Sequence, residues 1–266
     1  MRNLVIGSGG FTGKPFCKFL RDKGEEVVEM DVKNGENEDA RFVDLCLNDI
    51  DMVYFLAWDV GGAKYLYKED VQLSQLDWNL KLMTNVFNQL QVSKKPFLFI
   101  STQLVEELDT VYAATKRLGE IWTKLLGGAY VREWNVYGAF EAYDEKSHVI
   151  SDFIHQALTK GKIEMMTTGE EMRQFIHIDD VCSGWYEVGS KQLKGIFDIS
   201  TFEWVSILEV AKIIGSLTGA EVVPGTKKGN SHYFIPLKGK IPDWSAKVRL
   251  EDGLKGMIED YRKVIK

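Results

Sequence analysis

Short apolar runs alternate along the chain with longer stretches in which apolar residues recur every three or four positions. The short runs are typical of β-strands. They cover Leu4 to Ile6, Glu26 to Met30, Arg41 to Val43, Met52 to Leu56, Phe97 to Ile100 and Ala129 to Val131. Strands that alternate with helices predict a parallel sheet with helices on both faces. The expected fold class is therefore α/β, with a doubly wound parallel sheet.

Two of the periodic stretches are long enough to be helices. The first covers about residues 71–92, and its apolar stripe consists of Leu73, Leu76, Leu80, Met83, Phe87 and Leu90. The second covers about residues 112–126 and repeats the pattern with Leu118, Ile121, Trp122 and Leu125. We expect the first stripe to face the core.

Composition narrows the class of protein. The 266 residues include 45% hydrophobic ones and carry a net charge of −6, with acids and bases interspersed. That pattern predicts a soluble globular protein without the basic surface that nucleic acids require. Three widely spaced cysteines, Cys17, Cys46 and Cys182, favour a reducing compartment. No export signal or apolar run of about 18 residues is apparent, so we expect a cytoplasmic protein with no membrane partner.

A glycine-rich turn follows the first predicted strand and precedes a helix. It contains Gly7, Gly10 and Gly13 at three-residue intervals, with Phe11 and Thr12 between them. Such turns bring backbone N–H groups and a helix N-terminus to a pyrophosphate, although they also join strands to helices for packing reasons alone. Asp31 follows at the roughly 20-residue offset of the acid that bonds a ribose 2′-hydroxyl.

Together these residues predict a dinucleotide site at the start of a Rossmann-type fold. The carboxylate of Asp31 repels a 2′-phosphate, so NAD is the expected cofactor rather than NADP, although Lys33 nearby weakens that preference. Asp44 and Leu45 are candidates for the adenine edge, with a helix cap or a solvated turn as the alternative for Asp44.

A second motif places Tyr112 and Lys116 four residues apart, hence on one helix face. A nearby ammonium stabilises a phenolate, so we expect the Tyr112 pKa to fall from about 10 towards neutrality. Such pairs also arise by chance on solvated helices. Their position favours chemistry, because the strand before them ends at Thr102, and ligands of open α/β sheets bind at the carboxyl ends of strands.

With these motifs the chain resembles the extended short-chain dehydrogenase/reductase family, and within it the NAD-dependent nucleotide-sugar epimerases and dehydratases. The resemblance extends over nearly the whole sequence. Besides the glycine turn, Asp31, Tyr112 and Lys116, it includes Phe55-Leu56-Ala57, Asn79, the segment Arg132 to Gly138, the segment Arg173 to Val181, Trp244 and the segment Leu250 to Leu254.

The resemblance implies roles for individual residues. Tyr112 would be the acid/base, Lys116 its partner and anchor of the nicotinamide ribose, and Thr102 the hydroxyl that orients the reacting oxygen. Leu56, Ala57 and Asn79 would contact NAD. Asn135 and Arg173 would contact the diphosphate of the nucleotide sugar, and a planar guanidinium suits that task. His177 is expected to be structural, Asp179 and Asp180 to begin a helix, and a metal site is not expected.

The same resemblance implies a small C-terminal substrate-binding lobe. We place residues 1–137 in the dinucleotide-binding core, to which later segments return, and residues 138–266 mainly in the lobe. It also implies a homodimer, because family members pair the two long helices, and Trp78, Leu82 and Trp122 are apolar residues off the core stripes.

Two features depart from the family pattern. Only nine residues separate Thr102 from Tyr112, where the family has a longer loop, and no second phosphate-binding arginine is evident between Thr226 and Lys240, with Lys238 as the one candidate. Gln103 and Leu104 follow Thr102, and neither can transfer a proton. That disfavours dehydration and favours epimerisation, with C4 of an activated sugar as the expected position. A reductase or dehydratase of a nucleotide sugar and a catalytically idle NAD-binding regulatory protein are the alternatives.

Overall fold

A parallel six-stranded sheet lies at the centre of the computed structural model, which describes residues 1–107, 110–138, 141, 143–231 and 238–265. The strand order is β10-β5-β4-β3-β1-β2. The strands are β1 (Arg2–Ile6), β2 (Glu26–Met30), β3 (Met52–Phe55), β4 (Phe97–Thr102), β5 (Ala129–Glu133) and β10 (Gly195–Ile199). This arrangement confirms the predicted α/β class.

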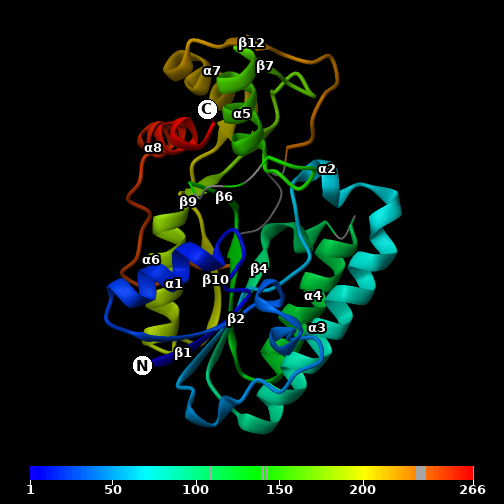
Figure 1. Ribbon diagram of the computed structural model, residues 1–266, viewed down its shortest axis with the longest axis vertical. Coiled ribbons are helices and arrows are strands. Elements are labelled where there is room, and N and C mark those ends of the chain that lie inside the picture. Colours follow the sequence, from blue (N-terminus) through cyan, green and yellow to red (C-terminus); the bar gives the residue numbers. More distant parts are fainter. Residues whose placement is uncertain (108–109, 139–140, 142, 232–237, 266) are drawn as a thin grey trace.

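Helices cover both faces of the sheet (Figure 1). On one face, α1 (Gly13–Asp22) and α6 (Ile178–Ser190) bury Phe16, Leu20 and Trp185 against the sheet. On the other face, α3 (Gln72–Ser93) and α4 (Val111–Leu125) pack around Phe87 and Phe99. The central strands β3 and β4 are buried on both faces, as in other parallel sheets, whereas the edge strand β2 is partly exposed.

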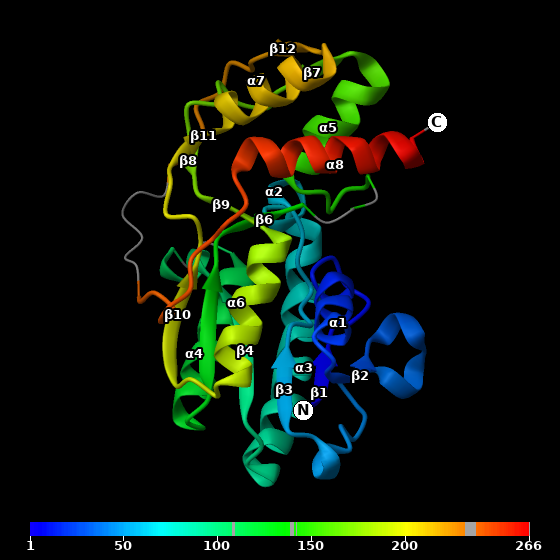
Figure 2. The same cartoon turned by 90° about the vertical axis from the view of Figure 1, so that its left-hand side faces the viewer.

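A smaller lobe stands at the end of the sheet where the strands terminate (Figure 2). It consists of α5 (Val149–Lys160), β7 (Lys162–Glu164), α7 (Ile207–Thr218), β12 (Glu221–Val223) and α8 (Leu250–Val264), which share a core of their own. Two strand pairs connect it to the sheet: β6 (Asn135–Tyr137) with β9 (Phe175–His177), and β8 (Met172–Arg173) with β11 (Val205–Ser206). Since α6 and β10 return to the sheet, later segments do complete the core; the boundary at residue 137 stays a prediction.

The remaining elements are short. They are α2 (Ala63–Leu66) and the 3₁₀ helices η1 (Val32–Asn34), η2 (Glu36–Glu38), η3 (Leu47–Asp49), η4 (Glu69–Val71) and η5 (Gln103–Glu106). None of the helices in the described part of the chain is long and apolar enough to cross a membrane.

The strand expected from Arg41 to Val43 is not formed, and that prediction is wrong. The segment turns instead, and its hydrogen bonds go to side chains of α3, with Asn85 and Gln89 both donating to the Val43 carbonyl. Arg41 lies flat over Trp78, 3.3 Å from the ring centroid. The strand that pairs with β1 on this side is β3.

The two long helices are where the periodicity predicts them, but parts of their faces are misassigned. Leu73 is 78% exposed, whereas Leu82, expected off the core, is buried. On α4, Leu118, Ile121 and Leu125 are exposed, while Trp122 stacks on Phe87. The sheet-facing side of α4 is instead built from small and polar residues, and a Cβ at Gly119 would come within 2.4 Å of the Phe99 ring. The position of α4 on the sheet is therefore set by close packing of the Gly119 backbone against the Phe99 ring and not by an apolar stripe.

Candidate active site

The glycine turn is shaped by contacts that exclude side chains. Gly7 adopts φ +96°, a conformation that favours glycine, and a Cβ there would lie 2.5 Å from the Ala57 nitrogen. A Cβ on Gly13 would lie 2.0 Å from the Gly7 oxygen. The first turn of α1 can therefore approach the end of β1 closely, and its N-terminus is directed towards the cavity beyond.

Asp31 closes this turn from the neighbouring strand. It follows β2, and its carboxylate accepts hydrogen bonds from the backbone N–H groups of Gly9 and Lys33, both at 2.9 Å. Lys33 Nζ donates to the Gly9 carbonyl at 3.1 Å. Each carboxylate oxygen keeps a second lone pair for a ribose hydroxyl. The residues present thus fit the adenosine half of a dinucleotide.

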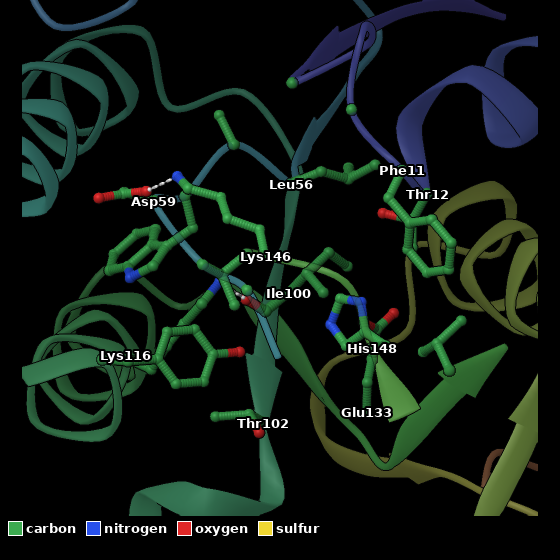
Figure 3. A pocket seen from close by; sticks show the side chains of 18 of the residues that line it. Phe11, Thr12, Leu56, Asp59, Ile100, Thr102, Lys116, Glu133, Lys146 and His148 are labelled. Carbon is green, nitrogen blue, oxygen red and sulfur yellow. Dashed lines mark hydrogen bonds and ion pairs between the residues drawn. The ribbon is translucent and has the colours of Figure 1, made fainter. Parts of the chain in front are cut away.

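A cavity of about 1160 Å³ extends from this turn along the carboxyl ends of the strands to β5. Most of the predicted site residues line it: Gly7, Gly10, Phe11, Thr12, Asp31, Leu56, Ala57, Thr102, Tyr112, Lys116, Asn135 and Arg173. Figure 3 shows Phe11, Thr12, Leu56, Thr102 and Lys116 around one space. The structure therefore brings together residues that lie far apart in the sequence.

Four predicted cofactor residues do not line the cavity. Gly13 packs on Gly7, and Asp44 caps the backbone N–H of Cys46. Leu45 is buried in the core, and its N–H donates to Gln89. The Asn79 side chain accepts a hydrogen bond from the Asp59 N–H and donates one to the Asp59 carbonyl, so it holds the loop after β3 in place.

Lys116 is 3% exposed, so it does not decorate a solvated helix. Its ammonium donates to the Ile100 carbonyl and lies 4.2 Å from the centroid of Trp58. Burial lowers the pKa of Lys116 to about 7, while Glu133 and Glu120 oppose that shift. Burying an ammonium costs free energy, so a buried lysine indicates a role other than keeping the surface soluble.

Tyr112 and Thr102 face each other across the cavity floor. Burial raises the pKa of Tyr112, the neighbouring Thr102 hydroxyl opposes the shift, and Glu133 adds to it. The Thr102 hydroxyl itself donates to the Gln103 amide oxygen at 3.0 Å. The expected fall of the Tyr112 pKa is therefore not found in the protein alone. The physical reason is that Lys116 is held on Ile100 and Trp58, so the dehydrated surroundings of the phenol dominate.

Glu133 is a site residue that the sequence reasoning missed. It ends β5 directly beside Thr102, which ends β4, and it lines the same cavity. Burial raises the pKa of Glu133 to about 8, and Lys116 partly offsets that effect. The signal was present, since a carboxyl at the end of a buried parallel strand faces the ligand edge of the sheet. The place of Glu133 beside Thr102 follows from the pairing of β4 with β5 and not from the residues next to Thr102 along the chain.

Arg173 and Asn135 lie where the first cavity meets a second one of about 970 Å³. Arg173 donates to the carbonyls of Met172 and Asn230, at 2.8 and 2.6 Å, and Asn135 donates to the Gln174 carbonyl at 2.9 Å. Burial lowers the pKa of Arg173. The second cavity continues into the lobe, between α5, β7 and β9.

The segment before α5 contributes two further cavity residues that were not predicted. Lys146 bonds Asp59 at 2.7 Å, and His148 bonds Glu141 at 2.8 Å while it stacks on Phe11 (Figure 3). Lys238, the candidate second phosphate ligand, pairs instead with Glu106 at 3.0 Å. Of the shortened loop between Thr102 and Tyr112, residues 108 and 109 lie outside the described residues.

His177 and the acids after it have structural roles, as expected. His177 Nδ1 accepts the N–H of Asp179 at the start of α6. Asp180 accepts the N–H groups of Lys247 and Val248, which fastens the segment before α8. Within the described residues no group of three or more His, Cys, Asp and Glu side chains is arranged to hold a metal ion.

A doubly wound sheet, a glycine turn with an acid after β2, and a buried lysine beside a half-buried tyrosine and a threonine are the combination expected of the short-chain dehydrogenase/reductase type. Comparison with known proteins identifies the family. Residues 3–199 match the sequence model of the NAD dependent epimerase/dehydratase family, and the chain belongs to it. The prediction of NAD as the cofactor is confirmed by that membership.

Individual relatives are distant. GDP-mannose 3,5-epimerase 1 of Oryza sativa subsp. indica is 25% identical over 96% of this chain and 80% of its own length. UDP-glucuronic acid decarboxylase 1 of Arabidopsis thaliana is 23% identical over 100% of this chain and 71% of its own. Among solved structures, UDP-glucuronic acid 4-epimerase from Bacillus cereus, in complex with UDP-glucuronic acid and NAD, has a TM-score of 0.81 at 22% identity, covering 99% of this chain and 100% of that one. This structural match establishes the fold.

Proposed function

We propose that the protein is an NAD-dependent epimerase that inverts C4 of a nucleotide-activated sugar. The observation that carries the proposal is the burial of Lys116 beside Tyr112 and Thr102 in the cavity that begins at the glycine turn. A protein that only binds NAD would have no use for a buried ammonium and a phenol at the end of the cofactor site. The non-enzymatic alternative is therefore disfavoured.

Tyr112 would take the proton of the sugar 4-hydroxyl and return it, and Thr102 would hold the same oxygen in line. NAD, when bound, supplies the hydride acceptor and donor. Lys116 would anchor the nicotinamide ribose, and its charge would assist Tyr112 once the bound ligands move the ammonium from the Ile100 carbonyl. Inversion requires the sugar to turn between the two hydride transfers, and the chain would hold the nucleotide fixed meanwhile.

The nucleotide would be held at the junction of the two cavities. Arg173 can grip a phosphate oxygen with the guanidinium N–H groups that its two backbone contacts leave free. Asn135 lies beside it on β6, and the second cavity has room for a nucleoside. This division would place the sugar towards Tyr112 and the base within the lobe.

The test is incubation of the purified protein with UDP- and GDP-linked hexoses and hexuronic acids, followed by proton NMR of the products. The proposal expects the 4-epimer to accumulate to equilibrium without net formation of NADH. A reductase or dehydrogenase would consume cofactor in proportion to product. Unchanged substrates, with NAD and a sugar nucleotide both shown to bind, would refute an enzymatic role.

One observation favours a second candidate, a dehydratase. The carboxyl of Glu133 lies beside Thr102, so the site does hold an acid near the reacting carbon, contrary to the argument from Gln103 and Leu104. Dehydration removes a proton from the carbon next to the transient ketone. The reaction run in deuterium oxide separates the two functions, because C4 epimerisation leaves carbon-bound deuterium out of the product and dehydration introduces it.

A further inference from the structure

The carboxyl of Glu133 is an unusual group for the interior of this protein. Its Oε1 is enclosed and accepts no hydrogen bond of good geometry from the described residues. The indole N–H of Trp185 lies near enough to favour the charged form, yet it too lacks a well-formed bond. A buried carboxylate without a partner costs several kcal/mol, so a ligand that neutralises it would be strongly favoured.

The position of Glu133 in the sheet indicates which part of the cofactor it meets. Asp31 follows β2 and Glu133 ends β5, and the strand order puts four strand spacings between them. At about 4.8 Å per spacing this is about 19 Å. One cavity connects the two residues. Asp31 belongs to the adenosine end, so Glu133 belongs to the other end, where Tyr112 and Thr102 also lie.

Hydride transfer fixes the occupant of that end. Because the nicotinamide ring would have to reach the carbon whose hydroxyl Tyr112 deprotonates, the residues that would hold it are those at the carboxyl ends of β4 and β5, Thr102 and Glu133. Figure 3 shows Lys116 and Glu133 on either side of Ile100 and Thr102. The Lys116 ammonium is already engaged with the Ile100 carbonyl and the Trp58 ring. The Lys116 charge offsets the burial of Glu133 only in part, and the oxidised ring would supply a further cation.

We propose that Glu133 is the counter-charge of the oxidised nicotinamide ring and favours bound NAD⁺ over bound NADH. The ring carries a positive charge in NAD⁺ and none in NADH, so a carboxylate nearby stabilises the oxidised form alone. The inference rests on the proposed function only in placing the ring at Tyr112. It applies equally to an epimerase and to a dehydratase, because both begin with the same hydride transfer.

This role suits an enzyme that recycles its own cofactor. NAD, when bound, would accept a hydride from the sugar C4–H bond and later return it, while Tyr112 would hold the hydroxyl proton between the two transfers. By favouring the oxidised ring, Glu133 would assist the return and keep the resting enzyme in the NAD⁺ form. A raised Glu133 pKa of about 8 in the protein alone agrees with a carboxyl that awaits a cation.

Calorimetric titration with NAD⁺ and NADH, without any sugar, tests the inference. The variants are Glu133→Gln and Glu133→Leu, with Asp31→Asn as a matched carboxylate-to-amide control at the other end. In both Glu133 variants the ratio of the NADH dissociation constant to the NAD⁺ dissociation constant should fall at least tenfold, about 1.4 kcal/mol. The midpoint potential of the bound couple should rise by at least about 30 mV.

The control should weaken both dinucleotides alike and leave the ratio unchanged, because the adenosine ends of NAD⁺ and NADH are identical. Glu133→Leu guards against a folding defect, since replacement of an unpaired buried charge by an apolar residue of similar size is well tolerated. A ratio within twofold of wild type in either folded Glu133 variant would overturn the inference. Failure of the wild-type protein to bind either dinucleotide would instead overturn the proposed function.

Discussion

The sharpest test of the proposed chemistry is Tyr112→Phe. The substitution removes one oxygen and keeps the ring against the cavity wall. In the folded protein it removes the phenol oxygen beside Thr102, and loss of one hydrogen bond would cost about 0.5–1.5 kcal/mol of stability. Because burial already raises the pKa of this phenol, much of that loss should be recovered by not burying a hydroxyl. We expect the free energy of unfolding to change by less than about 1 kcal/mol.

Turnover should change far more. Loss of a general acid/base lowers rates about 10²- to 10⁴-fold, equivalent to about 2.7–5.4 kcal/mol of barrier. The assay follows C4 inversion by NMR beside calorimetry of NAD binding and urea unfolding. Tyr54→Phe is the matched control, since Tyr54 is fully buried in the core and its hydroxyl has no hydrogen-bond partner in the described structure. Equal turnover of the folded Tyr112→Phe variant and wild type would refute the mechanism.

Four further outcomes follow from the site. Wild-type protein should bind NAD at least about tenfold more tightly than NADP by calorimetry, and Asp31→Ala should narrow that gap; equal wild-type affinities would remove the argument from Asp31. Lys116→Met should lower turnover. The Lys116 pKa is about 7 in the folded protein and about 10.4 in the unfolded chain, so between pH 8 and 10 only the unfolded chain binds this proton. The free energy of unfolding of the wild type should therefore rise by up to about 1.4 kcal/mol per pH unit relative to the variant. Urea unfolding measures this difference, and parallel curves against pH would contradict the prediction. Arg173→Ala should weaken sugar-nucleotide binding at least about tenfold and leave NAD binding intact, unless Arg173 serves only its backbone contacts. Finally, we propose a homodimer through α3 and α4, and Leu118→Glu should dissociate it in light scattering; a monomeric wild type at micromolar concentration would end that idea.

The class of fold followed from the sequence because strand and helix periods are local signals. The runs at β1 and β4 are apolar enough to be buried on both faces, and nothing else fits them. The run at Arg41 failed for the opposite reason. Phe42 and Val43 have strand propensity, but β3 occupies the place beside β1, and side chains of α3 hold the segment in a turn.

The helix faces illustrate a second limit. Periodicity finds an apolar stripe, yet α4 meets the sheet through Gly119 and the polar Thr115 and Lys116. Its apolar Leu118 and Ile121 face outward. A pattern of residue types cannot separate a stripe that faces the core from one that faces a second subunit, because both are apolar for the same physical reason.

The site residues were predictable where a motif keeps them close in sequence, as in the glycine turn and the Tyr112-Lys116 pair. Glu133 and Lys146 escaped because their place depends on which strands are neighbours and on how the lobe folds back. The strand order β10-β5-β4-β3-β1-β2 places β5 next to β4. Once that order is assumed, the end of β5 has to lie beside Thr102, and Glu133 could then have been named.

Charge along the cavity follows the order of charge along NAD. In the proposed orientation, Asp31 would accept hydrogen bonds from the ribose hydroxyls of adenosine, and the positive end of α1 would face the diphosphate. Glu133 would then lie beside the cationic ring. A dinucleotide bound in the reverse direction would leave Glu133 without a cation and would keep the ring far from Tyr112. Two acids about 19 Å apart, with N–H donors between them, thus specify the orientation that the hydride transfer requires.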